Sequence, residues 1–386
     1  MPPVLKIVSL VVFAQTLFTR AVDPVVPMIA ADLGVDVSTA ALLSSAFAFP
    51  YAIVQPALGV TADFFGKTRL MNLSLLVVAI AALICAVANS FSLLVAMRIA
   101  AGLMAGGVFP IAMALTGDLV PVNQRQVAIA RLLAVGLTGN LLGSSIAGVI
   151  GDVTGWRGVF AALGSFGLSV AVIAYFAFRG VETPPPAAFD RRAVIENFRG
   201  IMADPRAKVC FSSVFCEAIF IHGLFPYVGL LLLASGQGSA AVAGLLIAVF
   251  ATGGVLYSFV VRVLINRVPE RRLMLVGGAL AATGLVLVAL QLPWHWQIAA
   301  YAVLGFGFYL LHGCIQVHVT DLSTTARGAA ASLHSSCFYM GQALGPIVYG
   351  AAFTRFGAGP SIVFGAIVVL IVGMTCARLL RRPARA

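Results

Sequence analysis

Charged residues are scarce in this sequence, and their scarcity decides the class of protein. Asp, Glu, Lys and Arg make up only 10% of the 386 residues, whereas 61% are hydrophobic and the mean hydropathy is +1.05. So little charge does not cover the surface of a soluble protein. The sequence therefore predicts an all-α integral membrane protein.

The signatures of several other functions are missing as well. The six cysteines lie in apolar runs and form no C-x-x-C pair, so neither disulfides nor a zinc site are indicated. The chain has no G-x-S-x-G, P-loop or H-E-x-x-H motif, so we expect no enzymatic activity, no cofactor and no metal. The formal net charge is +11, but Lys and Arg form no run interleaved with aromatic residues, so no nucleic-acid partner is expected.

The chain does contain a series of apolar segments, each close to the roughly 20 residues that cross a bilayer. The first begins near Val4, continues past the length of a signal peptide and is followed by no small-residue cleavage site, so we predict that it is a membrane span. Twelve transmembrane helices are predicted in all, at 4–23, 39–61, 70–89, 92–116, 127–150, 158–178, 207–233, 239–264, 272–291, 297–319, 328–352 and 358–379.

The distribution of Lys and Arg predicts the orientation of these helices. Basic residues such as Lys67, Arg69 and Arg125 concentrate in the even-numbered connections and both tails, whereas the odd-numbered connections hold little beyond Arg157 and Arg355. Because basic loops stay on the cytoplasmic side, both termini are expected to be cytoplasmic. We expect a multi-pass protein of the cell inner membrane, monomeric and in contact with membrane lipid.

An internal repeat divides the chain into two halves. At offsets of 202 or 203 residues, Arg69-Leu70-Met71 returns as Arg272-Leu273-Met274, Asp118 as Asp321, and Gly139-x-x-Leu142-Gly143 as Gly341-x-x-Leu344-Gly345. A long polar connection with three consecutive prolines separates the copies and ends in a charged segment that is expected to form an interfacial helix. The predicted organisation is therefore two pseudo-symmetric six-helix bundles, at 1–180 and 206–386, joined by a cytoplasmic loop at 181–205.

The sequence GVTADFFGKTR, from Gly59 to Arg69, carries the most specific motif of the chain. Its pattern G-x-x-x-D-x-x-G-K-x-R resembles the signature loop between the second and third helices of the major facilitator superfamily, with Phe64 where that family usually has a basic residue. Arg98 and Gly102 resemble the family's fourth-helix motif, although Ala101 replaces its usual glutamine. The resemblance implies a cytoplasmic gate, in which Asp63 caps the helix at 328–352; its residues would be Gly59, Asp63, Gly66, Lys67, Arg69, Asp118 and Arg125.

The fifth predicted helix bears on the direction of transport. Gly139 to Ser144 is similar to the antiporter signature of the drug/proton antiporter branch, G-P-x-x-G-G, but lacks its proline. The resemblance implies efflux of a small organic solute by proton antiport through alternating access. Because the proline is lost, uptake of an organic anion by proton symport is the alternative, and a polytopic membrane enzyme or a sensor is a remote one.

Polar residues inside apolar runs are the candidates for proton coupling. Glu217 is the only acid well inside such a run, and low dielectric favours the neutral form of a lone carboxylate, so it can exchange a proton near neutral pH. Asp23 is expected to pair with Arg20, three residues before it, and Arg98 and His222 complete the proton-coupling set. The alternatives are a structural ion pair for Asp23, a hydrogen bond from a neighbouring helix for Glu217, and helix-end carbonyls for Arg98.

Stripes of polar residues at helical spacing are the candidates for a substrate cavity. Tyr309, His312 and Gln316 recur at steps of three and four, and other helices carry shorter stripes. The alternative is that these residues only serve helix packing. The predicted cavity residues are Arg20, Tyr51, Gln55, Tyr309, His312, Gln316, Tyr339 and Gln342.

Overall fold

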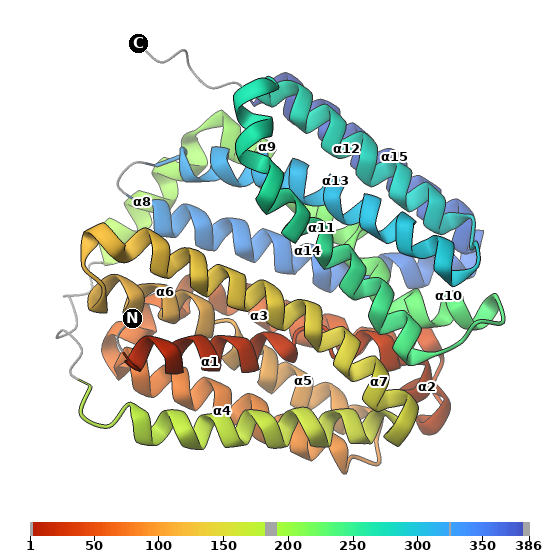
Figure 1. Cartoon of the computed structure of the whole chain (residues 1–386), viewed down its shortest axis with the longest axis horizontal. Helices are drawn as coiled ribbons and strands as arrows, with labels where there is room; N and C mark the ends of the chain where they lie inside the picture. Colours follow the sequence, from red (N-terminus) through yellow and green to blue (C-terminus); the bar gives the residue numbers. More distant parts are fainter. Residues whose placement is uncertain (1–2, 182–190, 324–325, 381–386) are drawn as a thin grey trace. The chain divides into compact units, whose positions relative to one another are not determined.

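The computed structural model describes residues 3–181, 191–323 and 326–380, without the side chains of 3, 57–64, 122, 123, 126, 130, 191, 193 and 194. Throughout these residues the chain forms helices and connections and no strand (Figure 1). The chain divides into two compact units, Met1–Phe189 and Asp190–Ala386. The division falls inside the connection predicted at 181–205.

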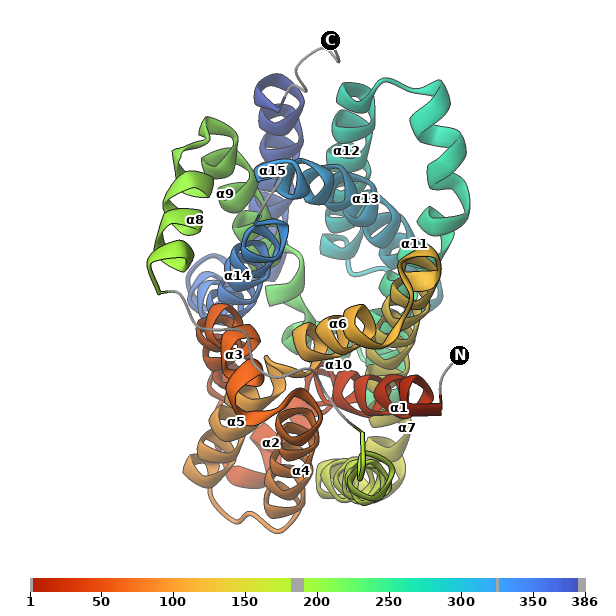
Figure 2. The same ribbon diagram turned by 90° about the vertical axis from the view of Figure 1, so that its left-hand side faces the viewer.

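Unit 1 is a bundle in which α1 and the first part of α7 run parallel, because Gly136, Gly139 and Gly143 of α7 meet Val12, Phe13 and Leu17 in turn. In this unit α4 packs against α5 and α7, and α1 packs along α7 (Figure 2). Its elements are α1 (Pro3–Leu17), η1 (Asp23–Val25), α2 (Val26–Leu33), α3 (Val37–Phe65), α4 (Lys67–Ala86), α5 (Phe91–Ala105), α6 (Val108–Leu119) and α7 (Val122–Ala177).

The helices of unit 2 pack in much the same way as those of unit 1. Within unit 2, α12 packs against α13 and α15 (Figure 1). In addition, α14 packs along α9 in this unit. Its elements are α8 (Arg191–Ala203), α9 (Pro205–Phe220), η2 (His222–Tyr227), α10 (Val228–Ala234), α11 (Ala240–Arg267), α12 (Glu270–Ala289), α13 (Trp294–Thr320), α14 (Arg327–Phe356) and α15 (Ala358–Leu379). The charged segment predicted as a helix after the polar connection is α8.

Every predicted span contains helical structure, and nine stretches of the described residues are long and apolar enough to cross a membrane. One of the nine, Val127–Ala177, runs through two predicted spans, which a non-helical Gly155 with φ of +75° separates inside α7. α1 offers only the shorter apolar stretch Val4–Leu17, and α14 is not among the nine. The count of twelve therefore stays a prediction.

The first and seventh predicted spans are not continuous helices, and this corrects the sequence reading. α1 ends at Leu17, and the chain resumes helical structure at η1, where Pro24 follows Asp23. In the same place of unit 2, α9 ends at Phe220 and η2 contains Pro226. A proline lacks the N–H that an α-helix needs at that position, so it favours such breaks. Asp23 and His222 consequently lie beyond the helices on which the sequence placed them.

Repeated glycines allow close helix contacts in both units. A Cβ on Gly143 of α7 would lie 3.0 Å from the Cα of Leu17 in unit 1. In unit 2, a Cβ on Gly345 of α14 would lie 2.5 Å from the Cα of Gly223. Both distances are below van der Waals contact, so only glycine permits this approach. The glycine repeat read from the sequence therefore marks equivalent contacts between the fifth and first, and the eleventh and seventh, predicted spans.

Asp36 begins α3 and gives the fold a measurable pH dependence. Its side chain accepts hydrogen bonds from Ser38 Oγ and from Thr39 N, the latter at 2.9 Å, and these bonds lower the pKa of the Asp36 carboxyl to about 2. A carboxyl whose folded pKa lies below its unfolded value of about 3.9 stabilises the fold above that value and loses the contribution as the pH falls toward 2.

We expect Asp36→Ala to lower the free energy of unfolding by about 1 kcal/mol at neutral pH. The two proteins should become equally stable as the pH falls from about 4 to about 2. Thermal unfolding of the purified proteins across this range measures the difference. A difference that does not depend on pH would contradict this account of the cap.

Candidate functional site

Glu217 lies near the C-terminal end of α9, a helix that Asp204 starts by accepting a hydrogen bond from Arg206 N. Its side chain is fully buried, and its Oε2 lies 3.0 Å from Nδ1 of His312 on α13. Its other oxygen, Oε1, has no hydrogen-bond partner among the described residues. The structure thus joins a residue predicted for proton coupling to one predicted for the substrate cavity. The hydrogen bond from a neighbouring helix, considered as the structural alternative for Glu217, is present.

The His312 ring is held by other rings on two helices. It stacks on Phe308 of its own helix with centroids 4.8 Å apart, and α14 places His334 and Phe338 at 5.0 and 5.3 Å. His334 is 5% exposed, and its Nε2 has no hydrogen-bond partner among the described residues. No signal in the sequence indicates this contact, because it joins residues on different helices.

His222 contacts aromatic rings. It lies in η2, where its ring is within 5.4 Å of Phe225, Phe250, Phe308 and Phe338. Glu217 and His222 were predicted to lie on one helix, but that helix ends at Phe220. His222 shares the aromatic cluster of His312 and Phe308.

A second buried acid, Asp23, lies in unit 1. Its Oδ2 lies 3.3 Å from Nη1 of Arg20, which confirms the predicted contact, and Ser44 of α3 donates its hydroxyl to Oδ1 at 2.6 Å. Asp23 is fully buried and Arg20 is 9% exposed. Both residues follow Leu17, where α1 ends, so the ion pair forms in the break and not on the continuous helix predicted at 4–23.

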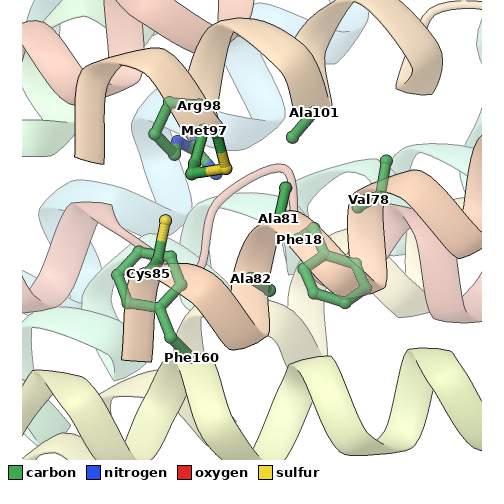
Figure 3. Close-up of a pocket in the computed structure, with 9 residues that line it drawn as sticks. All are labelled: Phe18, Val78, Ala81, Ala82, Cys85, Met97, Arg98, Ala101 and Phe160. Carbon is green, nitrogen blue, oxygen red and sulfur yellow. The ribbon is translucent and has the colours of Figure 1, made fainter. Parts of the chain in front are cut away.

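Arg98 is buried in α5 next to this pair. Its Nε donates to the Leu43 carbonyl at 3.2 Å, and its guanidinium lies 4.4 Å above the centroid of the Phe47 ring. The carbonyl contact is of the kind considered as the structural alternative for Arg98. Nη2 has no hydrogen-bond partner among the described residues. Arg98 borders a cavity of about 10 Å³, which Cys85, Met97 and Phe160 also line (Figure 3). That volume is room for about one water molecule.

The remaining cavity candidates differ in burial. Tyr51 and Gln55 on α3 and Gln342 on α14 are buried, with 7%, 5% and 7% exposure. Tyr309 and Tyr339 are half-buried, and Gln316 is exposed. Tyr51 and Gln55 belong to unit 1 and the others to unit 2, so whether they line one cavity stays a prediction.

The predicted gate is described in part. Gly66, with φ of +84°, separates α3 from α4, and Lys67 Nζ lies 2.7 Å from Oδ2 of Asp118. Arg125 donates to the Gly117 carbonyl at 2.5 Å. Arg69 is exposed. Gly59 and the Asp63 side chain, with its predicted cap on another helix, lie outside the described residues.

Unit 2 carries an altered version of the Lys67–Asp118 contact. At the position that the repeat matches to Lys67 it has Glu270, whose Oε1 lies 3.3 Å from Nε2 of His318. Both units thus place an acid against a basic side chain near this position, and they differ in which helix supplies the acid.

Comparison with known sequences supports one family. A sequence model described as Major Facilitator Superfamily matches residues 8–311 and 210–386. The chain is 25% identical over 360 residues to the quinolone resistance protein NorA of Staphylococcus aureus strain MRSA252, covering 92% of this chain and 90% of that protein. It is also 25% identical over 367 residues to the uncharacterized MFS-type transporter YwfA of Bacillus subtilis strain 168, covering 93% and 88%.

Solved structures show the same fold. A bacterial homologue of the human lysosomal transporter Spinster, inward-facing and unoccupied, matches with a TM-score of 0.76 at 18% identity and covers 98% of this chain and 94% of its own. A D-xylose-proton symporter matches with a TM-score of 0.73 at 16% identity and covers 97% and 95%. At such identities the likeness concerns the fold.

Proposed function

The chain belongs to the major facilitator superfamily, and from this premise we propose that it exports a small organic solute from the cell in exchange for protons. The family establishes a multi-pass membrane transporter. Proton coupling, direction of transport and the residues that carry both are our proposal. It includes alternating access in the inner membrane of the cell, with both termini in the cytoplasm.

One observation carries the proposal of proton coupling. Glu217 is a carboxyl with no exposed surface, and its one described hydrogen-bond partner is a histidine, a group that can be neutral or charged. A buried carboxylate without a fixed cation is costly, so protonation and deprotonation of Glu217 would change the stability of its surroundings. Asp23, by contrast, has a cation in Arg20 at 3.3 Å. Glu217 is therefore the stronger candidate for the proton-carrying group.

In the proposed cycle, a proton and the solute compete for the transporter. Binding of one favours release of the other, because a ligand shifts an equilibrium only through its different affinity for the two states. The gate residues, with Lys67 and Asp118 in contact, would close the cytoplasmic side in one state. The name of the relative NorA leads us to use a quinolone as the test solute.

Uptake of an organic anion is less well supported. That alternative needs the cationic groups Arg20, Arg98 and His312 to be available to a solute. Arg20 pairs with Asp23, Arg98 Nε donates to the Leu43 carbonyl, and His312 contacts Glu217. Apart from Arg98 Nη2, these groups already have partners within their own units, so we propose export of a solute over uptake of an anion.

Vesicles with an imposed pH gradient test the direction. The test solute is the quinolone norfloxacin. We expect purified protein in liposomes with an acidic interior to accumulate it, because protons leaving the vesicle drive the solute inward by antiport. Protein-free liposomes correct for passive trapping of the drug in the acidic compartment. Accumulation only when the interior is alkaline would indicate symport and would overturn the proposed direction.

A further inference from the structure

We propose that His312 is the residue through which Glu217 gains and loses its proton. The proposal rests on the proposed function, since it concerns the proton path of the same site. It moves His312 from the predicted substrate cavity to the proton-transfer machinery.

The exposure of the two side chains points to this role. The Glu217 side chain has 0% exposure, whereas the His312 side chain has 15%. One carboxyl oxygen, Oε1, is buried with no partner among the described residues, and the other lies 3.0 Å from His312 Nδ1. A proton that moves between Glu217 and water therefore has one described hydrogen-bond partner next to the carboxyl, and that partner is partly exposed. The other titratable groups that interact with the Glu217 charge are the thiols of Cys216 and Cys376.

The rings around His312 keep it in position for transfer. Phe308 stacks on it at 4.8 Å with an interplanar angle of 28°, and Phe338 lies at 5.3 Å from the other helix, α14. The titratable groups that contact the ring are Glu217 from α9 and His334 from α14. His334 is itself 5% exposed and lies beside the ring at 5.0 Å. These contacts hold the imidazole next to the Glu217 carboxyl, where it can pass a proton on.

The transfer consists of two proton movements on one imidazole, and protons and charge are conserved. In the starting tautomer, Nδ1 carries the proton and Nε2 has a free electron pair. A proton from water binds Nε2, and the Nδ1–H bond breaks as its proton moves to Glu217 Oε2. The products are a neutral imidazole protonated at Nε2 and a neutral carboxylic acid, and the reverse steps release the proton. The single proton taken from water is the one gained by the pair.

His312→Asn tests the proposal, because the asparagine amide can occupy the place of Nδ1 beside Glu217 but cannot relay a proton. The full-length protein in detergent is exposed to a rapid pH change, and infrared difference spectra follow the carboxylic acid band of Glu217. That band is identified by its loss in Glu217→Gln. In His312→Asn we expect the band to reach the wild-type amplitude but to appear at a rate roughly tenfold or more below that of the wild type. Proton transfer by a positioned side chain accounts for factors of at least this size. His295→Asn, an exposed histidine on the same helix, should keep the wild-type rate.

A second variant distinguishes the loss of proton transfer from a structural effect of the substitution. In His312→Ala, added imidazole should restore the rate in proportion to its concentration and should leave wild-type protein unchanged. A wild-type rate in His312→Asn, or a slow rate in His312→Ala that imidazole does not restore, would overturn the role of His312. A band that persists in Glu217→Gln would instead contradict the proposed function, so the two failures are distinguishable.

Discussion

Glu217→Gln is expected to abolish transport driven by a pH gradient and to leave exchange of solute for solute intact. Glutamine keeps the size of the side chain and can still hydrogen-bond His312 Nδ1, which lies 3.0 Å from Glu217 Oε2 in the wild-type protein. It cannot carry a proton, so a coupled cycle loses its driving ion. We expect norfloxacin accumulation driven by the pH gradient to fall by roughly 100-fold or more, within the range found for loss of a proton-transferring group.

The same substitution at an exposed position provides the matched control. Glu196 on α8 pairs with Arg192, and its side chain is 61% exposed. Glu196→Gln should transport as the wild type does. If Glu217→Gln retained pH-driven accumulation, Glu217 would not be the coupling residue, and if it lost solute exchange as well, its role would be structural.

Gly345→Ala is expected to disrupt the packing of unit 2. The added Cβ would lie 2.5 Å from the Cα of Gly223 and 2.8 Å from the Ile219 carbonyl oxygen, and both are backbone atoms. Backbone cannot move aside as a flexible side chain can, so α14 must shift away from α9 and η2. We expect a loss of roughly 3 kcal/mol or more in the free energy of unfolding, the upper end of the usual cost of overpacking.

Gly328→Ala is the control on the same helix, because a Cβ at Gly328 would meet no atom within 4 Å. Replacing glycine by alanine in a helix normally adds about 0.5–1 kcal/mol of stability, so this variant should be equal to or more stable than the wild type. Thermal unfolding and monodispersity in detergent compare the two. Equal stability of Gly345→Ala and Gly328→Ala would show that the helices tolerate a wider separation than the structure has.

The glycine contacts show which part of the fold could be predicted from sequence. Gly143 and Gly345 were recognised as repeat partners by their spacing alone, and the structure places both at close contacts between corresponding helices. Hydropathy predicted where helices lie because the bilayer fixes their length and composition. It did not predict the breaks after Leu17 and Phe220, since proline and apolar residues continue the apolar run without continuing the helix.

The candidate site was harder to predict, because its contacts cross between helices. Glu217 was identified as an acid in an apolar run, but its partner His312 is 95 residues away and no local pattern links the two. The pair of Arg20 and Asp23 was predicted because its members are three residues apart. Ser44 and Leu43, which bind Asp23 and Arg98, come from another helix and were not predicted as their partners. Sequence spacing thus finds contacts within an element, and packing decides the others.

The central claim is that the solute competes with a proton bound to Glu217. Calorimetry tests this claim most directly. Norfloxacin is titrated into the purified protein at one pH in buffers of different ionisation enthalpy, which gives the number of protons released on binding. The account predicts proton release by the wild type and none by Glu217→Gln, with norfloxacin still bound. Equal proton release by the two proteins would contradict it.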